Sequence, residues 1–176
     1  MAEHRINVEE LKDKAPLLQA GDRVYLSGTV YTSRDAAHKR ICALLDAGEP
    51  LPFPLEGACI YYAGPTPAEP GRVIGSCGPT TSGRMDRFAP RLLDLGLKAM
   101  IGKGQRSADV VSAIVRNGAV YFCAVGGAGA LAAKSITSCE EIAFHDLGCE
   151  SVKRLTVCAF PLIVAIDAQG RSLFER

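Results

Sequence analysis

The chain has 176 residues, a length that suits one domain with a sizeable hydrophobic core. Its net charge of +1 lacks the basic excess that is typical of nucleic-acid-binding proteins. The N-terminal segment is too rich in charged residues for a signal peptide, and no apolar run is long enough to span a bilayer. We therefore expect a cytoplasmic protein that binds neither nucleic acid nor a membrane.

Strands and helices are predicted from hydrophobic periodicity, helix caps and turn residues. In chain order they are a short helix from residue 8, a strand at 22–32, a helix at 33–46 capped by Ser33, strands at 58–62 and 72–76, a helix at 86–94, a strand at 97–101, a helix at 107–116 capped by Ser107, a strand at 119–125, a helix at 128–135, and strands at 141–144, 155–157, 162–167 and near 172–174. Helices and strands alternate mainly in the middle of the chain, and the C-terminal part is richer in strand. This order predicts a single α/β domain over residues 1–176, with a mixed sheet in a β/β/α layered arrangement.

The seven cysteines are odd in number and show no C-x-x-C spacing. Several lie in apolar segments such as 121–125, where a reduced thiol acts as a small core residue. We therefore predict free thiols and no metal or cluster site built from this chain alone. The cysteines are Cys42, Cys59, Cys77, Cys123, Cys139, Cys149 and Cys158.

Three consecutive hydroxyl side chains lie in the predicted loop Gly78–Asp86, which follows a predicted strand. Glycines free the backbone around Thr80, and Arg84 supplies a planar cation suited to bidentate carboxylate binding. Hydroxyls, free N–H groups and positive charge can together hold a small dianion. The alternative is a tight turn that caps a helix and leaves Arg84 on the surface.

Two further cations are candidates for the same site. Lys103 lies between two glycines directly after a predicted strand, so Lys103 and Arg84 could converge on one edge of a sheet. Arg34 lies in the first turn of a predicted helix, where the helix end already favours anions. The alternatives are a solvated lysine in a turn and a surface charge cluster that includes His38, itself more typical of a hydrogen-bonded residue than of a ligand.

The segment Gly126–Ala132 matches the pattern G-x-G-x-x-[GA] between a predicted strand and a predicted helix. Glu150 follows at roughly the distance of a ribose-binding acid, so the segment could bind a nucleotide. The chain lacks room for two mononucleotide-binding halves beside its other elements. We therefore favour close packing of a helix against the sheet, or a loop that contacts a partner.

Together these segments resemble the β subunit of the class I, iron–sulfur-dependent fumarate hydratases, a family that also includes L-tartrate dehydratase β subunits. The resemblance covers nearly the whole chain. The Gly78–Asp86 motif is specific to the family, whereas the glycine-rich segment Gly126–Ala132 alone is not. The segments that carry it are Ser33–Arg40, Gly78–Asp86, Lys103–Ser107, Val125–Ala130 and Phe160-Pro161.

The resemblance implies a domain like the swivelling β/β/α domain of aconitase-like enzymes. It also implies a separate α subunit that carries a [4Fe–4S] cluster, so that this chain would ligate no metal and be inactive alone. Thr80 resembles the family's catalytic base by position, and Arg34, Arg84 and Lys103 resemble its contacts to the substrate carboxylates. The implied reaction is the hydro-lyase interconversion of fumarate and (S)-malate, which are C4 dicarboxylates.

Three other functions stay open from the sequence. The chain could be an L-tartrate dehydratase β subunit, a non-catalytic module that binds an anion or a nucleotide through Gly126–Ala132, or a purely structural assembly subunit. A fumarate hydratase is preferred because the segments 82–86 and 103–107 are more similar to the fumarase versions.

Overall fold

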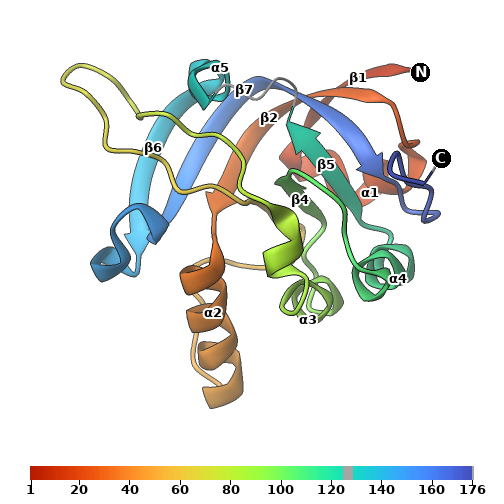
Figure 1. The fold of residues 1–176 in the computed structure, drawn as a ribbon, viewed down its shortest axis with the longest axis horizontal. Helices are drawn as coiled ribbons and strands as arrows, with labels where there is room; N and C mark the ends of the chain where they lie inside the picture. The colour runs from red at the N-terminus through yellow and green to blue at the C-terminus, as the bar shows by residue number, and fades with distance from the viewer. Residues whose placement is uncertain (125–128, 176) are drawn as a thin grey trace.

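The computed structural model describes residues 1–124 and 129–175. Seven strands form one mixed sheet in the order β1-β2-β3-β4-β5-β7-β6, and an additional pairing joins β2 to β7. Strands β2, β3, β4, β5 and β7 therefore close a ring, and the sheet curls into a small barrel (Figure 1). The strands are β1 (Glu3–Asn7), β2 (Arg23–Thr32), β3 (Cys59–Tyr61), β4 (Ala99–Gly102), β5 (Val120–Ala124), β6 (Ile136–Ala143) and β7 (Val152–Ile166).

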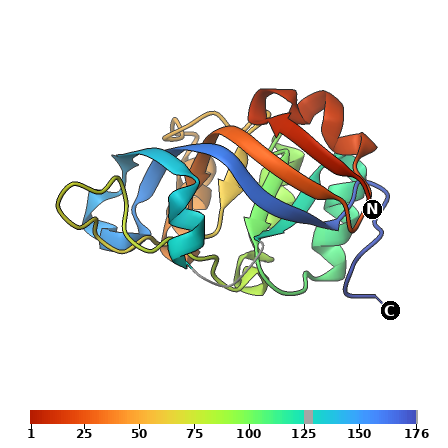
Figure 2. The same ribbon diagram turned by 90° about the horizontal axis from the view of Figure 1, so that it is seen from above.

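The strands from β1 to β5 pair in parallel, whereas β7 runs antiparallel to β2, β5 and β6. Figure 2 shows β2 and β7 side by side along the length of the molecule. The helices are α1 (Leu11–Lys14), α2 (Asp35–Ala47), α3 (Ala89–Asp94), α4 (Ala108–Asn117) and α5 (Gly129–Lys134), with shorter helical turns η1 (Val8–Glu10), η2 (Ala15–Leu17), η3 (Ser82–Met85) and η4 (His145–Glu150).

Two hydrophobic cores follow from the alternation of side chains along the strands. One core fills the barrel interior with side chains such as Leu26, Tyr61 and Phe122. The other lies on the outer face, where neighbouring residues such as Ile60 and Tyr121 pack against α2, α3 and α4. These three helices lie together on one side of the barrel in Figure 1. The carboxyl ends of β2, β3 and β4 are therefore framed by helices on the outside and a packed core within.

The expected mixed α/β architecture is confirmed, and most predicted elements are present. The predicted strands at 22–32, 58–62, 97–101 and 119–125 correspond to β2 to β5, although Val125 lies outside the described residues. The predicted helices at 107–116 and 128–135 correspond to α4 and α5, and Ala128 also lies outside the described residues. No prediction was made for β1, which pairs with the first half of β2.

The predicted strand at 72–76 is wrong, because this segment forms part of a projecting loop. Gly71 has φ +80°, and the ends of the loop bond to each other, with Thr66 N–H donating to the Ser76 carbonyl at 3.0 Å. Val73 is exposed, and β3 pairs directly with β4. The loop Gly78–Asp86 is therefore reached by a long excursion from β3 and does not directly follow a strand.

Two further predictions need correction. The segments 155–157 and 162–167 form one strand, β7, because Phe160-Pro161 continues opposite β2 and Ala159 absorbs a bulge with φ +49°. The segment 172–174 contributes a single bridge from Ser172 to Ile166 and no strand.

The N-cap of α2 is also different from the prediction. Arg34 occupies the N-cap position of α2, while the Ser33 hydroxyl lies 2.7 Å from His38 Nδ1. A histidine one turn into the helix competes successfully for the hydroxyl that was expected to cap it. The helix ends at Ala47, one residue beyond the predicted end, where Gly48 adopts the left-handed conformation with φ +68°.

Candidate functional site

Thr80 and Arg84 form the centre of the candidate site. Arg84 lies in the turn η3, and its Nη2 donates a hydrogen bond to Thr80 Oγ1 at 2.7 Å. The Thr80 N–H donates to the Tyr62 carbonyl, directly after β3, at 2.7 Å. A permanent cation therefore faces a hydroxyl whose backbone is tied to the end of a central strand.

Asp35 orients Arg84 from the first turn of α2. Arg84 Nε lies 3.3 Å from Asp35 Oδ1, and both side chains remain partly exposed. The helix N-terminus favours a carboxylate at this position. The sequence analysis did not predict that Asp35 orients Arg84. The only indication in the sequence was that Asp35 directly follows Arg34, a predicted site residue.

Arg34 packs against the chain that leaves β3. A Cβ added to Gly64 would lie 2.8 Å from Arg34 Nη1 and 2.9 Å from Arg34 Cδ, so the arginine fills the space beside this glycine. Arg34 Nε is buried and has no hydrogen-bond partner within the described part of the chain, with Glu150 Oε1 4.0 Å away. A buried donor without a partner can donate to an anionic ligand.

Lys103 meets the Thr80 loop through its backbone. Thr81 and Lys103 form an isolated parallel bridge, in which Ser82 N–H donates to the Lys103 carbonyl at 2.9 Å. Lys103 N–H donates in return to Ser82 Oγ at 3.0 Å, and the Lys103 side chain is exposed.

The structure brings all four predicted residues to one end of the sheet. Arg34 follows the carboxyl end of β2, Lys103 follows that of β4, and Thr80 is bonded to the residue after β3. Arg84 joins them through Thr80 and through Asp35, the neighbour of Arg34. Arg34, Thr80, Arg84 and Lys103 thus lie at one edge of the sheet, although the route of the chain to Thr80 differs from the predicted one.

A buried cation ties the two loops together next to this site. Arg106 has a fully buried side chain and donates from Nε to Asp86 Oδ1 at 2.6 Å. Its Nη2 donates to the Tyr62 hydroxyl at 3.1 Å. Burial would lower the pKa of Arg106, but Tyr62 and the Asp86 carboxylate raise it above its ordinary value, so the guanidinium stays charged.

A second buried link runs through Tyr121 of β5. Its hydroxyl lies 2.8 Å from Ser82 Oγ and 2.8 Å from the Gly104 carbonyl, so it bridges the two loops. Burial raises the pKa of the Tyr121 phenol far above its ordinary value, which keeps the hydroxyl protonated. Sequence reasoning missed both buried links, because nothing in the local pattern pairs a strand tyrosine or Arg106 with a distant loop.

His38 supports Arg34 from within α2. The side chain is fully buried, and its Nδ1 lies 2.9 Å from the Arg34 carbonyl. A carbonyl only accepts, so Nδ1 donates to it in the tautomer that carries the proton on Nδ1; the Ser33 hydroxyl lies 2.7 Å from the same nitrogen. Burial lowers the pKa of His38 to about 4, so the ring is neutral near pH 7. The prediction that His38 is a hydrogen-bonded residue is confirmed.

Metal-ligating groups do not gather in the described chain. Within residues 1–124 and 129–175, no three His, Cys, Asp or Glu side chains lie so that they could hold a metal ion. Cys59 and Cys77 are buried core thiols, whereas Cys149 and Cys158 are exposed. Burial raises the pKa of Cys77 to about 12, which disfavours the thiolate that a metal or a cluster binds.

The glycine-loop prediction falls partly on residues 125–128, which lie outside the described residues. Gly129, at the start of α5, packs against the chain that enters the Thr80 loop. Cys77 N–H donates to the Gly129 carbonyl at 3.2 Å, and a Cβ on Gly129 would lie 2.9 Å from Gly78 N. At Gly129 the glycine therefore serves close backbone packing beside the candidate site.

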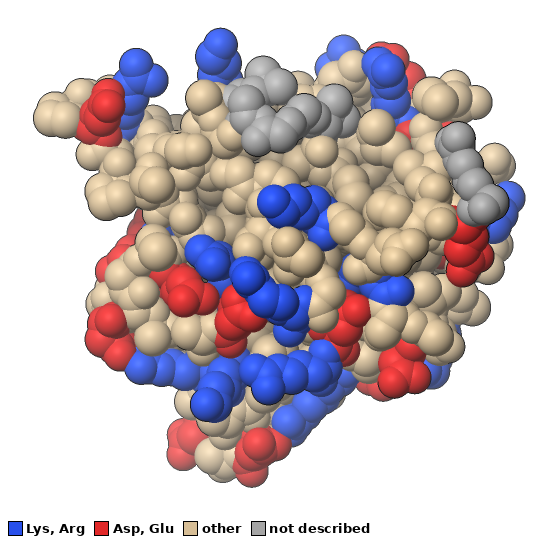
Figure 3. All heavy atoms as spheres, viewed as in Figure 1, with Lys and Arg blue, Asp and Glu red and all other residues tan. Residues whose placement is uncertain are grey.

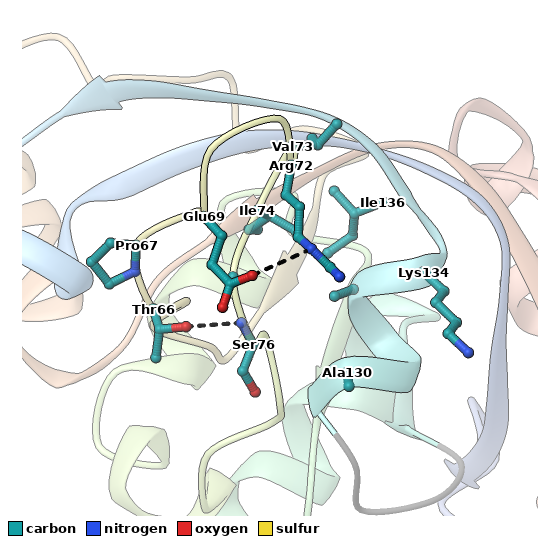
Figure 4. A pocket seen from close by; sticks show the side chains of 12 residues that line it. Thr66, Pro67, Glu69, Arg72, Val73, Ile74, Ser76, Ala130, Lys134 and Ile136 are labelled. Carbon is teal, nitrogen blue, oxygen red and sulfur yellow. Dashed lines mark hydrogen bonds and ion pairs between the residues drawn. The ribbon is translucent and has the colours of Figure 1, made fainter.

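A cavity of about 540 Å³ lies apart from these residues, between the projecting loop and the α5–β6 segment (Figure 4). Arg72 points toward Glu69 across it, with the ion pair at 3.6 Å. None of the four predicted site residues lines this cavity. Lys134 also lines the cavity, and Glu69 and Arg72 pair with each other there.

Charge is concentrated near the candidate site. Figure 3 shows Lys and Arg side chains in a band over α2 and α3, interleaved with Asp and Glu. Several of these cations have acidic partners, including Arg40 with Asp146 and Arg91 with Asp46. The barrel domain therefore carries the Thr80 hydroxyl and a group of cations at one end of its sheet, a combination that is suited to a small anion.

Comparison with known proteins shows which family this domain belongs to. The model of the family described as "Fumarase C-terminus" matches residues 1–176, so the chain belongs to this family. The putative L(+)-tartrate dehydratase subunit beta of Methanocaldococcus jannaschii is 41% identical over 164 residues, which cover 90% of this chain and 84% of that protein. The L(+)-tartrate dehydratase subunit beta of Escherichia coli K12 is 35% identical over 173 residues, covering 96% and 83%.

Longer relatives contain the same domain as a part. Fumarate hydratase 2 of Leishmania major is 36% identical over 171 residues, which are 96% of this chain but only 30% of that protein. The chain thus spans less than a third of this fumarate hydratase and most of each tartrate dehydratase beta subunit. The family predicted from the sequence motifs is confirmed. In residues 1–124 and 129–175, no helix is long and apolar enough to cross a membrane.

Proposed function

We propose that this chain is the β subunit of a two-subunit hydro-lyase that interconverts fumarate and (S)-malate in the cytoplasm. The observation that carries the proposal is the hydrogen bond from Arg84 to Thr80, with Arg34 and Lys103 at the same end of the sheet. Family membership supports the reaction class, and the relatives named as fumarate hydratase and as tartrate dehydratase beta subunits support a C4 dicarboxylate as the substrate.

Thr80 is the proposed base. Removing a proton beside a carboxylate needs a strong base, and a threonine hydroxyl is only weakly acidic. The Arg84 guanidinium, 2.7 Å from Thr80 Oγ1, favours the alkoxide form of Thr80 by charge and by hydrogen bonding. The proton removed from the carbon of (S)-malate would pass to Thr80 Oγ1, and the reverse step would return it during hydration of fumarate.

Arg34, Arg84 and Lys103 are the proposed contacts to the substrate carboxylates. Loss of the proton concentrates negative charge on the neighbouring carboxylate, so cations stabilise the transition state more than the ground state. Within the described residues the buried Arg34 Nε has no hydrogen-bond partner, and Lys103 is exposed at the same end of the sheet. This arrangement fits a short molecule with a carboxylate at each end.

The proposed partner is a longer α subunit that carries a [4Fe–4S] cluster. Within residues 1–124 and 129–175 the cysteines belong to no group of three potential metal ligands, which is compatible with a cluster held by the partner. When bound to the partner, the cluster supplies a Lewis acid for the hydroxyl group that leaves. We further propose that this domain swivels toward the partner, as in aconitase-like enzymes, so that the candidate site closes over the substrate.

The second candidate is an L-tartrate dehydratase β subunit. The relatives named as L(+)-tartrate dehydratase beta subunits, which are 41% and 35% identical to this chain, support this alternative. Tartrate is also a C4 dicarboxylate, and the same hydroxyl and cations would serve it. A nucleotide-binding module through Gly126–Ala132 has no comparable support.

The test is to produce this chain together with a cluster-bearing α subunit under anaerobic conditions. The complex is then assayed with fumarate, (S)-malate and L-tartrate, with each subunit alone as the control. The proposal expects turnover of fumarate and (S)-malate by the complex only. A complex with an intact cluster that turns over L-tartrate alone supports the second candidate, and one that is inactive on all three diacids contradicts both.

A further inference from the structure

The two loops of the candidate site share one buried cation, and that cation has no access to a ligand. The Arg106 side chain is 0% exposed, whereas Arg84 is 50% exposed. Arg106 can therefore act on a substrate only through the residues that it holds.

The contacts of Arg106 reach both loops. Asp86, at the end of the Thr80 loop, accepts from Arg106 Nε through Oδ1 and from Ser107 N–H through Oδ2 at 2.7 Å. The carboxylate thus fixes the end of the first loop to the second loop and to the start of α4. Because Asp86 is mostly buried, removing its cation would leave a poorly solvated charge.

The aromatic contacts of Arg106 extend the same link to Thr80. The guanidinium carbon lies 5.2 Å from the centre of the Tyr62 ring and 4.8 Å from that of Tyr121, within the range of a cation–π interaction. The Tyr62 carbonyl accepts the Thr80 N–H, and the Tyr121 hydroxyl contacts the Gly104 carbonyl next to Lys103. One side chain is therefore packed against the two residues that hold Thr80 and Lys103.

The geometry points to Arg106 as a positioning residue, which sets Thr80 and Arg84 relative to Lys103 through Asp86, Tyr62 and Tyr121. This inference rests on the proposed function for the roles of Thr80, Arg84 and Lys103. It adds that the correct spacing of base and cations depends on a charge that never touches the substrate. A displacement of about 1 Å between reacting groups can lower a rate about a hundredfold.

The test compares two arginines that each form an ion pair with an aspartate. Arg106→Lys keeps the positive charge, but lysine cannot bond Asp86 and the Tyr62 hydroxyl with a planar fork. Arg116→Lys is the control, because Arg116 also pairs with an aspartate, Asp94, at 2.9 Å, on the exposed side of α4. Both variants are produced in the reconstituted complex.

Two measurements are made on each variant. The first is turnover, for which Arg106→Lys is expected to lower kcat about ten- to a hundredfold and Arg116→Lys less than twofold. The second is amide hydrogen exchange of the complex, read at Ser82, Lys103 and Ser107. Their N–H groups donate to the Lys103 carbonyl, Ser82 Oγ and Asp86 Oδ2, so Arg106→Lys is expected to speed exchange at least about tenfold there, while the amides of β4 keep their protection.

Tyr121→Phe provides a second variant in case Arg106→Lys does not fold. It removes only the hydroxyl that lies 2.8 Å from Ser82 Oγ and from the Gly104 carbonyl. The same rise in exchange at Lys103, with a fall in kcat and a correctly folded barrel, supports the inference.

Unchanged exchange at these three amides in a folded variant overturns the inference, as does unchanged kcat with altered exchange. A wild-type complex that is inactive on every diacid contradicts the proposed function instead. The exchange measurement still decides in that case whether Arg106 sets the loops, so the two failures can be told apart.

Discussion

Arg84 Nη2 lies 2.7 Å from Thr80 Oγ1, while Nε of the same guanidinium lies 3.3 Å from Asp35 Oδ1. The arginine thus bridges a hydroxyl on one loop and a carboxylate at the start of α2. Its charge is directed at the hydroxyl oxygen, and its orientation is set by a residue from another element. This relationship gives a weakly acidic hydroxyl a permanent cation in hydrogen-bond contact.

Replacing Thr80 with alanine is expected to lower kcat of the complex about a hundred- to ten-thousandfold, with a much smaller change in KM. The variant removes the proposed base but leaves Arg34, Arg84 and Lys103 to bind the carboxylates. Steady-state kinetics with (S)-malate measure both constants.

Thr81→Ala is the matched control for that variant. Thr81 is exposed, and its link to Lys103 is a backbone bridge that alanine retains. Its kcat is expected to stay within about twofold of wild type, in keeping with a surface substitution. Equal losses in the two variants would show that the loop, and not the Thr80 hydroxyl, limits the reaction.

Asp35→Asn tests whether the carboxylate orients Arg84. Both partners are more than a third exposed, so the pair contributes about 0.2–1 kcal/mol and its loss is expected to lower kcat by no more than about fivefold. The free energy of unfolding should change by less than about 1 kcal/mol. Asp35→Asn should cause no further loss of kcat when Arg84 is already replaced by glutamine. Additive effects of the two substitutions on kcat would mean that Asp35 does not act through Arg84.

The strands that pair locally could be predicted from the sequence, because β-branched runs such as Arg23–Thr32 have a clear period. The segment 72–76 has a similar composition, but Gly75 packs closely against Thr66, whose N–H bonds the Ser76 carbonyl and so joins the ends of the loop. Ring closure through β2 and β7 could not be predicted, since it depends on pairing between residues more than a hundred positions apart.

The exposed residues of the site could be predicted from sequence motifs, whereas the buried residues that hold them in place could not. Arg84 and Lys103 stand beside glycines, and Gly78 precedes Thr80 by two residues; such glycines mark turns and loops. Tyr121 looked like an ordinary strand residue, and only the fold places its hydroxyl between two loops. Long-range polar contacts of this kind leave no period in the sequence.

Gly102→Ala is expected to disrupt the junction of the two loops. A Cβ at Gly102 would lie 1.9 Å from Ser82 Oγ and 2.9 Å from Tyr62 Cδ2, so Ser82 must give up its bond with the Lys103 N–H. Overpacking of this kind lowers the free energy of unfolding by about 1–3 kcal/mol. Urea titrations followed by circular dichroism measure the loss, since the chain has no tryptophan.

Gly83→Ala is the comparison for that substitution, because the nearest atom to its added Cβ is the Gln105 carbonyl oxygen at 3.9 Å. Its free energy of unfolding should stay within about 0.5 kcal/mol of wild type. Similar destabilisation by both alanines would mean that the Ser82 contact is not the cause.

Acid is expected to destabilise the fold through His38 before the carboxylates titrate. Its pKa is about 4 in the folded state, because the ring is buried, and about 6.5 in the unfolded chain. As pH falls from 6.5 toward 4, the unfolded state takes up a proton that the folded state does not. The free energy of unfolding should therefore decrease by up to about 1.4 kcal/mol per pH unit, and the contribution of His38 is fully retained above pH 6.5.

Urea unfolding at pH 7.5, 6.0 and 5.0 measures this slope, with His38→Gln as the variant that cannot titrate. The glutamine amide can still donate to the Arg34 carbonyl, which His38 Nδ1 contacts at 2.9 Å in the wild type. Carboxylates with lowered pKa values, such as Asp22 and Glu141, begin from ordinary values of 3.8 and 4.5 and therefore act mainly below this window. A wild-type slope equal to that of His38→Gln would mean that the buried ring is protonated in the folded state.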